Sequence, residues 1–193
     1  MIGNDVVDMD LAATQSNWKR KGFLGKVFTV SEREYILSSE EIDSTVWLLW
    51  SMKEAAYKAH QRKYQLPRKL SWQRQECIVT KLNGNTASGM VKIEGQYYDT
   101  KSLISSGLVF TSAVKDGTIP VKNAIFRSSS EEMKQNFIRD FSHYYHLPKE
   151  KISIQKNVHG VPVLTCGDRK HSCGFSFTGH GKFSAFSMAL MNC

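Results

Sequence analysis

Asp5 is a carboxylate inside a short apolar segment near the start of the chain. Residues 2–7 read Ile-Gly-Asn-Asp-Val-Val, a pattern that predicts a β-strand. Placing a carboxylate among buried strand residues costs free energy unless a cation or hydrogen bonds compensate it. A metal ion is one such cation. Taken alone, however, Asp5 is better explained by a side chain that faces water or caps a turn.

Glu54 and Lys58 supply a partner for that carboxylate. A helix is predicted over 45–61, because apolar residues recur there at spacings of three and four. The two charged residues are four apart and so share one helix face, where an exposed pair contributes only about 0.2–0.5 kcal/mol. Trp47 and Trp50 continue the same stripe, which is unusual beside a solvated pair. Asp5 on the strand and Glu54 with Lys58 on the helix are therefore candidates for one site that binds a cation, with an exposed ion pair as the alternative.

Segment 175–183 holds a third set of polar side chains. It reads Phe-Ser-Phe-Thr-Gly-His-Gly-Lys-Phe, two apolar runs around a turn with glycines. Glycines permit close backbone approach, and exposed N–H groups in such turns form anion-binding concavities. Thr178, His180 and Lys182 are therefore candidates for holding phosphate oxygens. An ordinary hairpin with incidental polar residues explains the pattern equally well.

Hydrophobic periodicity predicts the elements that must position these residues. The residues Thr-Val-Ser-Glu at 29–32 predict a helix start. Alternating runs separated by turn signals predict antiparallel strands at 77–82, 90–93 and 108–114.

A similar order of elements begins again near residue 119. The predicted elements are a strand at 121–126, a helix at 130–145, and strands around 152, 163 and 175–190. We predict an α+β fold of two similar lobes, 1–118 and 119–193, in which antiparallel sheets pack with helices. The segments 107–114 and 181–188 resemble each other over a short length only, so the sequence leaves duplication open.

Composition and charge narrow the classes of function. The chain of 193 residues is 41% hydrophobic, which excludes global disorder, and its net charge of +8 favours a polyanionic partner. That partner could be nucleic acid, a phosphate-rich cofactor or an acidic protein. The basic clusters 19–21 and 62–63 are interpreted as solvated faces, with contact to an acidic protein as the alternative.

The start of the chain and its apolar runs bear on location. Residues 1–10 do not resemble a signal peptide, and no apolar run approaches the roughly 18 residues of a membrane-spanning helix. We expect a cytoplasmic protein without a membrane partner.

Two motifs in the first third of the chain resemble the signatures of the 4'-phosphopantetheinyl transferases. Residues 2–8, Ile-Gly-Asn-Asp-Val-Val-Asp, resemble the Gly-x-Asp strand of that family. Residues 50–59, Trp-Ser-Met-Lys-Glu-Ala-Ala-Tyr-Lys-Ala, resemble its Trp-x-x-Lys-Glu-Ala/Ser-x-x-Lys helix. The coincidence of both motifs in order makes this resemblance specific.

The later motifs match more loosely. Gly-Val-Pro at 160–162 looks like the family's Gly-Lys-Pro turn, with valine in place of lysine. Residues 175–178 look like a strand that ends in Ser-His in the family, where the histidine contacts a phosphate of coenzyme A. Thr178 stands for the serine and Gly179 for the histidine, while His180 is displaced by one position.

The resemblance implies both an architecture and a reaction. The motif order is similar to that of the short trimeric enzymes, whereas the length is similar to that of the longer monomeric ones. A monomeric pseudo-dimer of two lobes reconciles the two, with a trimer as the alternative. The implied reaction moves the phosphopantetheine arm of coenzyme A onto a serine of an acyl or peptidyl carrier protein.

The roles of individual residues are implied by the same resemblance. Magnesium, or alternatively manganese, would be held by Asp5 and Glu54. Asp8 or water would replace a further acid of the longer enzymes, whose position is Val7 here. Lys58 would hold the phosphate, and Glu54 would accept the serine proton directly or through water. The remaining expected roles are proton acceptance by Lys53, as an alternative, and coenzyme A binding by Lys58, Thr178, His180 and Lys182.

Two other functions compete with this reading. The altered motif at 178–179 is also compatible with a catalytically impaired module of the same fold that binds coenzyme A or a carrier protein. A nucleic-acid-binding protein is permitted by the charge, but no recognised binding motif supports it, and we expect no nucleic-acid partner.

Overall fold

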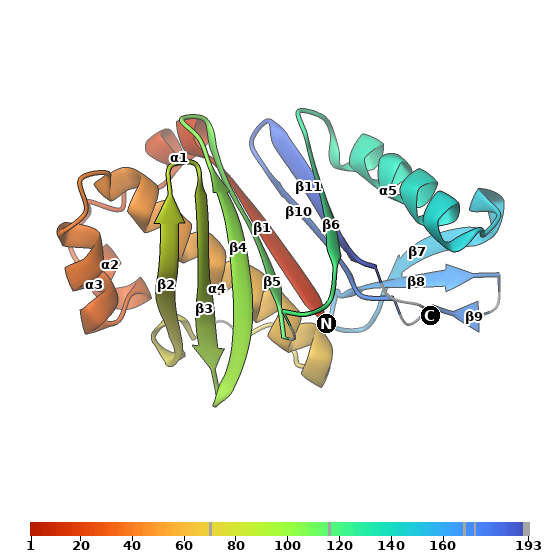
Figure 1. The fold of residues 1–193 in the computed structure, drawn as a ribbon, viewed down its shortest axis with the longest axis horizontal. Helices are drawn as coiled ribbons and strands as arrows, with labels where there is room; N and C mark the ends of the chain where they lie inside the picture. Colours follow the sequence, from red (N-terminus) through yellow and green to blue (C-terminus); the bar gives the residue numbers. More distant parts are fainter. Residues whose placement is uncertain (70, 116, 168, 172, 191–193) are drawn as a thin grey trace.

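The computed structural model describes residues 1–69, 71–115, 117–167, 169–171 and 173–190. The first part of the chain forms a five-stranded antiparallel sheet of order β1-β5-β4-β3-β2 (Figure 1). Its strands are β1 (Ile2–Asp8), β2 (Gln75–Asn83), β3 (Thr86–Ile93), β4 (Gln96–Ile104) and β5 (Leu108–Val114). Together with the helices described next, this makes the fold α+β, as predicted.

Helix α4 (Ile42–Tyr64) lies across one face of this sheet (Figure 1). Its apolar stripe is buried against β1 and β5, which confirms the helix predicted over 45–61 and extends it at both ends. Gly3 allows the close approach of β1, because a Cβ atom there would lie 2.0 Å from the carbonyl oxygen of Ala55. The strand motif and the helix motif are thereby held in direct contact.

Three short helices connect β1 to α4. They are α1 (Met9–Gln15), α2 (Phe23–Val27) and α3 (Val30–Leu37). Thr29 caps α3, since its side chain accepts from the N–H of Glu32 and the Glu32 carboxylate accepts from the N–H of Thr29. This is the helix start predicted at 29–32.

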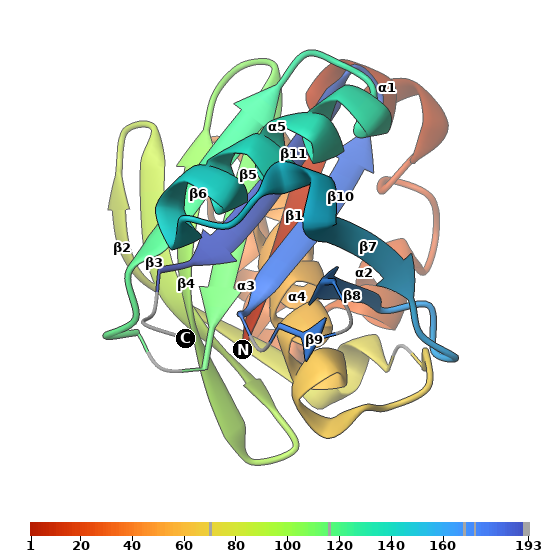
Figure 2. The same ribbon diagram turned by 90° about the vertical axis from the view of Figure 1, so that its right-hand side faces the viewer.

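The second part of the chain forms two three-stranded sheets and one long helix. One sheet has the order β10-β11-β6 and the other β7-β8-β9, and α5 lies over the first (Figure 2). The elements are β6 (Val121–Phe126), α5 (Ser130–Tyr145), β7 (Ile152–Lys156), β8 (Pro162–Cys166), β9 (Arg169–Lys170), β10 (Phe175–His180) and β11 (Phe183–Ala189). Single-turn helices η1 (Trp72–Arg74) and η2 (Lys149–Lys151) precede β2 and β7.

Strand β11 is buried on both of its faces. Phe186 and Met188 belong to the core beneath α5, whereas Phe183 and Ala185 pack with Val6 and Phe110 of the first sheet. This small third cluster joins the two larger cores. The division into lobes at residues 118 and 119 therefore stays a prediction.

Strand β4 was not predicted, for a physical reason. Its buried positions include Thr100 and Ser102, so burial alternates along the strand while hydrophobicity does not. The glycine at position 95 is the sequence feature that indicates a turn before β4. In the structure Glu94 and Gly95 both have positive φ, as type I′ hairpins require. Among the described residues, no helix is long and apolar enough to cross a membrane.

Candidate active site

Lys58 brings the strand motif and the helix motif together. Its Nζ lies 2.7 Å from the carbonyl oxygen of Asn4, 3.2 Å from Oδ1 of Asp5 and 3.3 Å from Oγ1 of Thr178. The Asp5 side chain is 11% exposed and that of Lys58 is 24% exposed. Residues from both ends of the chain therefore meet around one partly accessible ammonium.

These residues line a pocket of about 320 Å³. Asp5, Glu54 and Lys58 form its charged side, and Trp47 and Trp50 form an aromatic side. The pocket is completed by Val6, Val7, Ala12, Ser16, Arg68, Thr178, Gly179 and His180.

Trp50, on the aromatic side, packs against two further aromatic rings. The ring of Trp50 lies 4.3 Å from the ring of Trp72 and 6.2 Å from that of Phe23, measured between centroids. Packing on both sides restricts the tryptophan rotamer. The aromatic side of the pocket is therefore held in a defined position.

A larger cavity of about 750 Å³ adjoins this pocket. The two share Glu54, Lys58, Arg68, Thr178 and Gly179. Farther from the shared residues, the cavity is lined by basic side chains of the second part of the chain, namely Lys134, Lys156 and His159. An elongated anionic ligand could extend from one into the other.

The two carboxyl groups are poorly compensated by the protein. Burial, together with the nearby Asp5 carboxylate, raises the pKa of Glu54 to about 7 against the opposing effects of Lys58 and Arg68. Burial also raises the pKa of Asp5, although Lys58 acts in the other direction. Asp5 is buried and Glu54 is partly buried, and the raised pKa of each shows that Lys58 and Arg68 do not fully offset the burial of these carboxylates. An added cation would therefore be stabilised beside them.

Asp5 and Glu54 suit a magnesium ion in their chemistry. Magnesium takes oxygen ligands, keeps several waters, and is commonly bound through one or two carboxylates plus substrate phosphates. The described residues contain no group of three or more His, Cys, Asp or Glu side chains that could hold a metal by themselves. The remaining ligands would therefore come from water and substrate.

Lys53 lines neither cavity, so its expected role as an alternative proton acceptor has no geometric support. Its ammonium is fully buried and lies 2.7 Å from Oε2 of Glu32. It also donates to the carbonyl oxygens of Val27 and Trp72. Lys53 is adjacent to Glu54 in sequence, and the helix directs the two side chains to different places.

Asp8 and Lys182 have protein partners outside the pocket. Oδ1 of Asp8 accepts from the N–H groups at the start of α1, and its Oδ2 accepts from the N–H of Lys182 at 3.0 Å. The Lys182 ammonium pairs with Asp10. Neither Asp8 nor Lys182 lines either cavity, so their expected roles as metal ligand and coenzyme A ligand have no geometric support.

Thr178 and His180 do line the pocket. His180 accepts the N–H of Asp8 through Nδ1 at 2.9 Å. A neutral ring in this arrangement carries its proton on Nε2. Thr178 belongs to both cavities and contacts Lys58.

The structure places two arginines where the sequence analysis did not expect them. Arg62, expected on a solvated face, is buried and donates to the carbonyl oxygens of Ile2 and Phe175, both at 3.0 Å. Arg68 lines both cavities and was not predicted at all. Its only sequence signal was a basic residue directly after Leu-Pro beyond the helix, which is a weak one.

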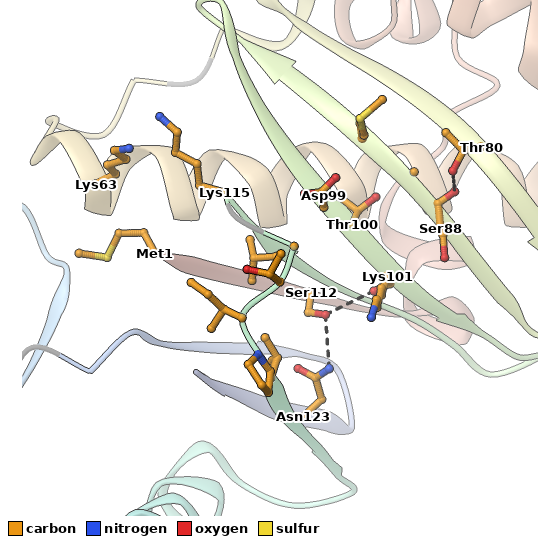
Figure 3. Close-up of a pocket in the computed structure, with 18 residues that line it drawn as sticks. Met1, Lys63, Thr80, Ser88, Asp99, Thr100, Lys101, Ser112, Lys115 and Asn123 are labelled. Atoms are coloured by element: carbon orange, nitrogen blue, oxygen red, sulfur yellow. Dashed lines mark hydrogen bonds between the residues drawn. The ribbon is translucent and has the colours of Figure 1, made fainter. Parts of the chain in front are cut away.

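A third cavity, of about 1170 Å³, lies away from these residues (Figure 3). It is bounded by the face of the first sheet opposite α4 and by the segment leading into β6. Lys63 and Lys115 stand at one end, and Asn123 reaches Ser112 across it (Figure 3). None of the predicted site residues lines this cavity.

Comparison with known proteins bears on the first half of the chain. Residues 1–106 match a family model described as the 4'-phosphopantetheinyl transferase superfamily. This span covers more than half of the 193 residues and includes Asp5, Glu54 and Lys58. The curated proteins contain no match to the chain.

Proposed function

The chain belongs to the 4'-phosphopantetheinyl transferase superfamily, and on that premise we propose that it moves the phosphopantetheine arm of coenzyme A to a serine hydroxyl of an acyl or peptidyl carrier protein. Membership of the superfamily implies phosphopantetheine transfer in general. The observation that supports this reaction for the present chain is the meeting of Asp5, Glu54 and Lys58 at one pocket.

The proposed reaction exchanges one phosphorus–oxygen bond for another. The serine oxygen bonds to the phosphorus that carries the pantetheine arm, and the bond from that phosphorus to the bridging oxygen breaks. 3',5'-Adenosine bisphosphate leaves with the electron pair. Glu54 takes the serine proton directly or through water. Lys58 holds the phosphate oxygens as charge shifts during transfer.

Asp5 and Glu54 would hold the magnesium or manganese ion. When bound, the ion would supply neutralisation of the pyrophosphate charge. Lys58 remains beside Asp5 to offset the negative charge on the other side of the site. Asp8 is better assigned to capping α1, since its oxygens already have backbone donors.

We propose that coenzyme A spans the two adjoining cavities, which share five lining residues. The nucleotide end would occupy the larger cavity, beside Lys134, Lys156 and His159. The pyrophosphate would then lie at the shared residues, which include Lys58 and Arg68. The pantetheine arm would run along Trp47 and Trp50, on the aromatic side of the smaller pocket.

Both halves of the chain contribute to this arrangement. Glu54 and Lys58 come from the first half, whereas Thr178 and His180 come from the second. Such sharing supports a pseudo-dimer within a single chain, and a site that needs no second copy. We therefore propose a monomer, with a trimer as the alternative.

The carrier protein would approach beside the pocket. The basic segment 19–21 lies between Ser16, which lines the pocket, and Phe23, which packs on Trp50. Lys19, Arg20 and Lys21 are exposed there. An acidic carrier protein would be attracted to this surface.

The test is transfer by the full chain with coenzyme A, magnesium and a panel of apo carrier proteins, read by intact-protein mass spectrometry. The wild-type chain should add the phosphopantetheine mass to at least one carrier, and Glu54→Gln should abolish the addition without unfolding. Glu76→Gln, on an exposed strand position, is the matched control and should stay active. Full activity of Glu54→Gln would refute the assignment.

A binding module of the same fold is the second candidate. The departure from the family pattern at Thr178 and Gly179 is the observation that favours it. Coenzyme A binding by calorimetry with no turnover on any carrier would support this candidate over the enzyme. Retention of nucleic acid on a filter at moderate salt would instead point to the third class of function.

A further inference from the structure

Strand β10 meets β1 through side chains rather than through a backbone ladder. Alternate N–H groups of β1 donate to alternate side chains of β10, always to the residue 172 positions later. The pairs are Asn4 N–H to Ser176 Oγ at 3.0 Å, Val6 N–H to Thr178 Oγ1 at 3.3 Å, and Asp8 N–H to His180 Nδ1 at 2.9 Å. The side chains stand in for the carbonyls of a neighbouring strand.

Thr178 differs from the other two because it also touches the charged side of the pocket. Its hydroxyl accepts from Lys58 Nζ at 3.3 Å and donates to Asp5 Oδ1 at 3.4 Å. With the N–H of Val6 as the second donor, one donor and two acceptor positions are all used.

The contact has a directional consequence for Asp5. Lys58 and Thr178 both bind the same oxygen, Oδ1. This shared contact fixes the rotation of the carboxylate and the position of the ammonium together. Threonine suits the position, because a β-branched side chain on a strand has few χ1 options.

We propose that Thr178 is a positioning residue, whose hydroxyl sets the Asp5 carboxylate and the Lys58 ammonium for transfer, rather than a ligand that binds coenzyme A. This inference rests on the proposed function. It assigns the altered motif a task that threonine performs without the histidine of the family pattern.

Steady-state kinetics on three variants test the assignment. Thr178→Val keeps the shape and removes the hydroxyl. Thr178→Ser restores the hydroxyl. Ser176→Ala is the matched control, because it also deprives one N–H group of β1 of its partner but leaves Asp5 and Lys58 untouched.

The expected result separates kcat from KM. Thr178→Val should lower kcat by about tenfold, with KM for coenzyme A changed by less than about twofold, since the lost contact acts on the reacting groups. Thr178→Ser should recover most of kcat, and Ser176→Ala should keep it within about twofold. Thermal unfolding should show that both Thr178→Val and Ser176→Ala are folded at the assay temperature.

Three outcomes would overturn the inference. A raised KM at unchanged kcat would make Thr178 a substrate ligand. Equal losses of kcat in Thr178→Val and Ser176→Ala would mean that only the junction of the two strands matters. Wild-type kinetics in Thr178→Val would show that the hydroxyl does not position Asp5 and Lys58. If the valine variant does not fold, Thr178→Ala provides the same measurement.

A binding measurement separates this inference from the proposed function. If the wild-type chain transfers nothing, the proposed function fails, and titration with Mn²⁺ followed by electron paramagnetic resonance decides the inference alone. Thr178→Val should then weaken Mn²⁺ binding severalfold relative to Ser176→Ala. Equal Mn²⁺ affinity in both variants would overturn it.

Discussion

Two lysines of α4, Lys53 and Lys58, each pair with a carboxylate from another element, and the two pairs differ in how many hydrogen-bond partners the protein supplies. Lys53 and Glu32 are buried, and the Lys53 ammonium has three acceptors at 2.7, 2.8 and 3.1 Å. Glu32 accepts in addition from the N–H groups of Thr29 and Cys77. Every charge in this cluster has a protein partner.

The cluster around Lys58, five residues further on, is left incomplete. The Lys58 ammonium pairs with Asp5, and the side chains of Asp5, Glu54 and Lys58 all line a pocket. Within the part of the chain that the structure describes, the Glu54 carboxylate has no hydrogen bond or ion pair, and its pKa rises to about 7. Residue type and spacing therefore do not distinguish a structural lysine–carboxylate pair from a reactive one. The number of hydrogen-bond and ionic partners that the protein supplies does distinguish them.

The largest expected effect is on the satisfied pair. Lys53→Met should lower the free energy of unfolding by about 3–5 kcal/mol, because it leaves the Glu32 carboxylate buried without its cation. Urea unfolding at neutral pH measures this loss. The double variant Lys53→Met/Glu32→Gln should recover a substantial part of it, since no buried charge then remains.

A small loss of unfolding free energy in Lys53→Met would contradict the distinction between Lys53 and Lys58, because Lys53 would then not have a structural role. Retained phosphopantetheine transfer by the folded double variant would sharpen it. Such activity would separate Lys53 from proton transfer altogether.

The second expected effect is a gain of stability at the incomplete cluster, measured on protein freed of divalent metal. The pKa of Glu54 is raised from 4.5 to about 7 in the fold. Its contribution to stability is therefore present below pH 4.5 and is lost as the pH rises through 7. Glu54→Gln cannot ionise, so at pH 8 it should be more stable than wild type by about 2 kcal/mol, allowing for partial exposure.

Urea unfolding at pH 4 and at pH 8 measures this difference, which should nearly vanish at the lower pH because the unfolded carboxyl is then also protonated. Glu76→Gln, at an exposed position, should show no such dependence. An equal gain at both pH values would indicate that Glu54 is not held protonated by its surroundings. The gain in stability together with lost activity would mark Glu54 as a residue retained for chemistry.

Sequence reasoning located the incomplete cluster better than the satisfied one. Asp5, Glu54 and Lys58 stood out because a carboxylate in an apolar strand and charges beside tryptophans are costly without a reason. Lys53 gave a weaker signal, since it lies between Leu49 and Ala56 on the buried stripe of the helix. Its partners are two backbone carbonyls and a carboxylate from α3, and such tertiary contacts leave no local pattern.

The same limit explains the other differences between expectation and structure. The buried guanidinium of Arg62 and the junction between β1 and β10 depend on segments more than a hundred residues apart. Strand β4 was hidden because threonine and serine occupy buried positions. Local periodicity instead predicted α4 and α5 well, since each has one continuous apolar stripe.

The smallest expected effect concerns lysines that the protein does not bury at all. Lys19 and Lys21 are exposed beside the pocket, so Lys19→Glu/Lys21→Glu should change the free energy of unfolding by less than about 0.5 kcal/mol. The kcat/KM for an acidic carrier protein should nevertheless fall about fivefold at low salt, because charge complementarity raises the encounter rate. Adding salt should shrink the difference from wild type, since exposed charges are screened beyond about 10 Å at 0.1 M ionic strength. Lys81→Glu/Lys101→Glu, at exposed positions of β2 and β4, changes the net charge by the same amount and is the matched control. If this control lowered kcat/KM as much, overall charge rather than the surface at 19–21 would guide the carrier protein.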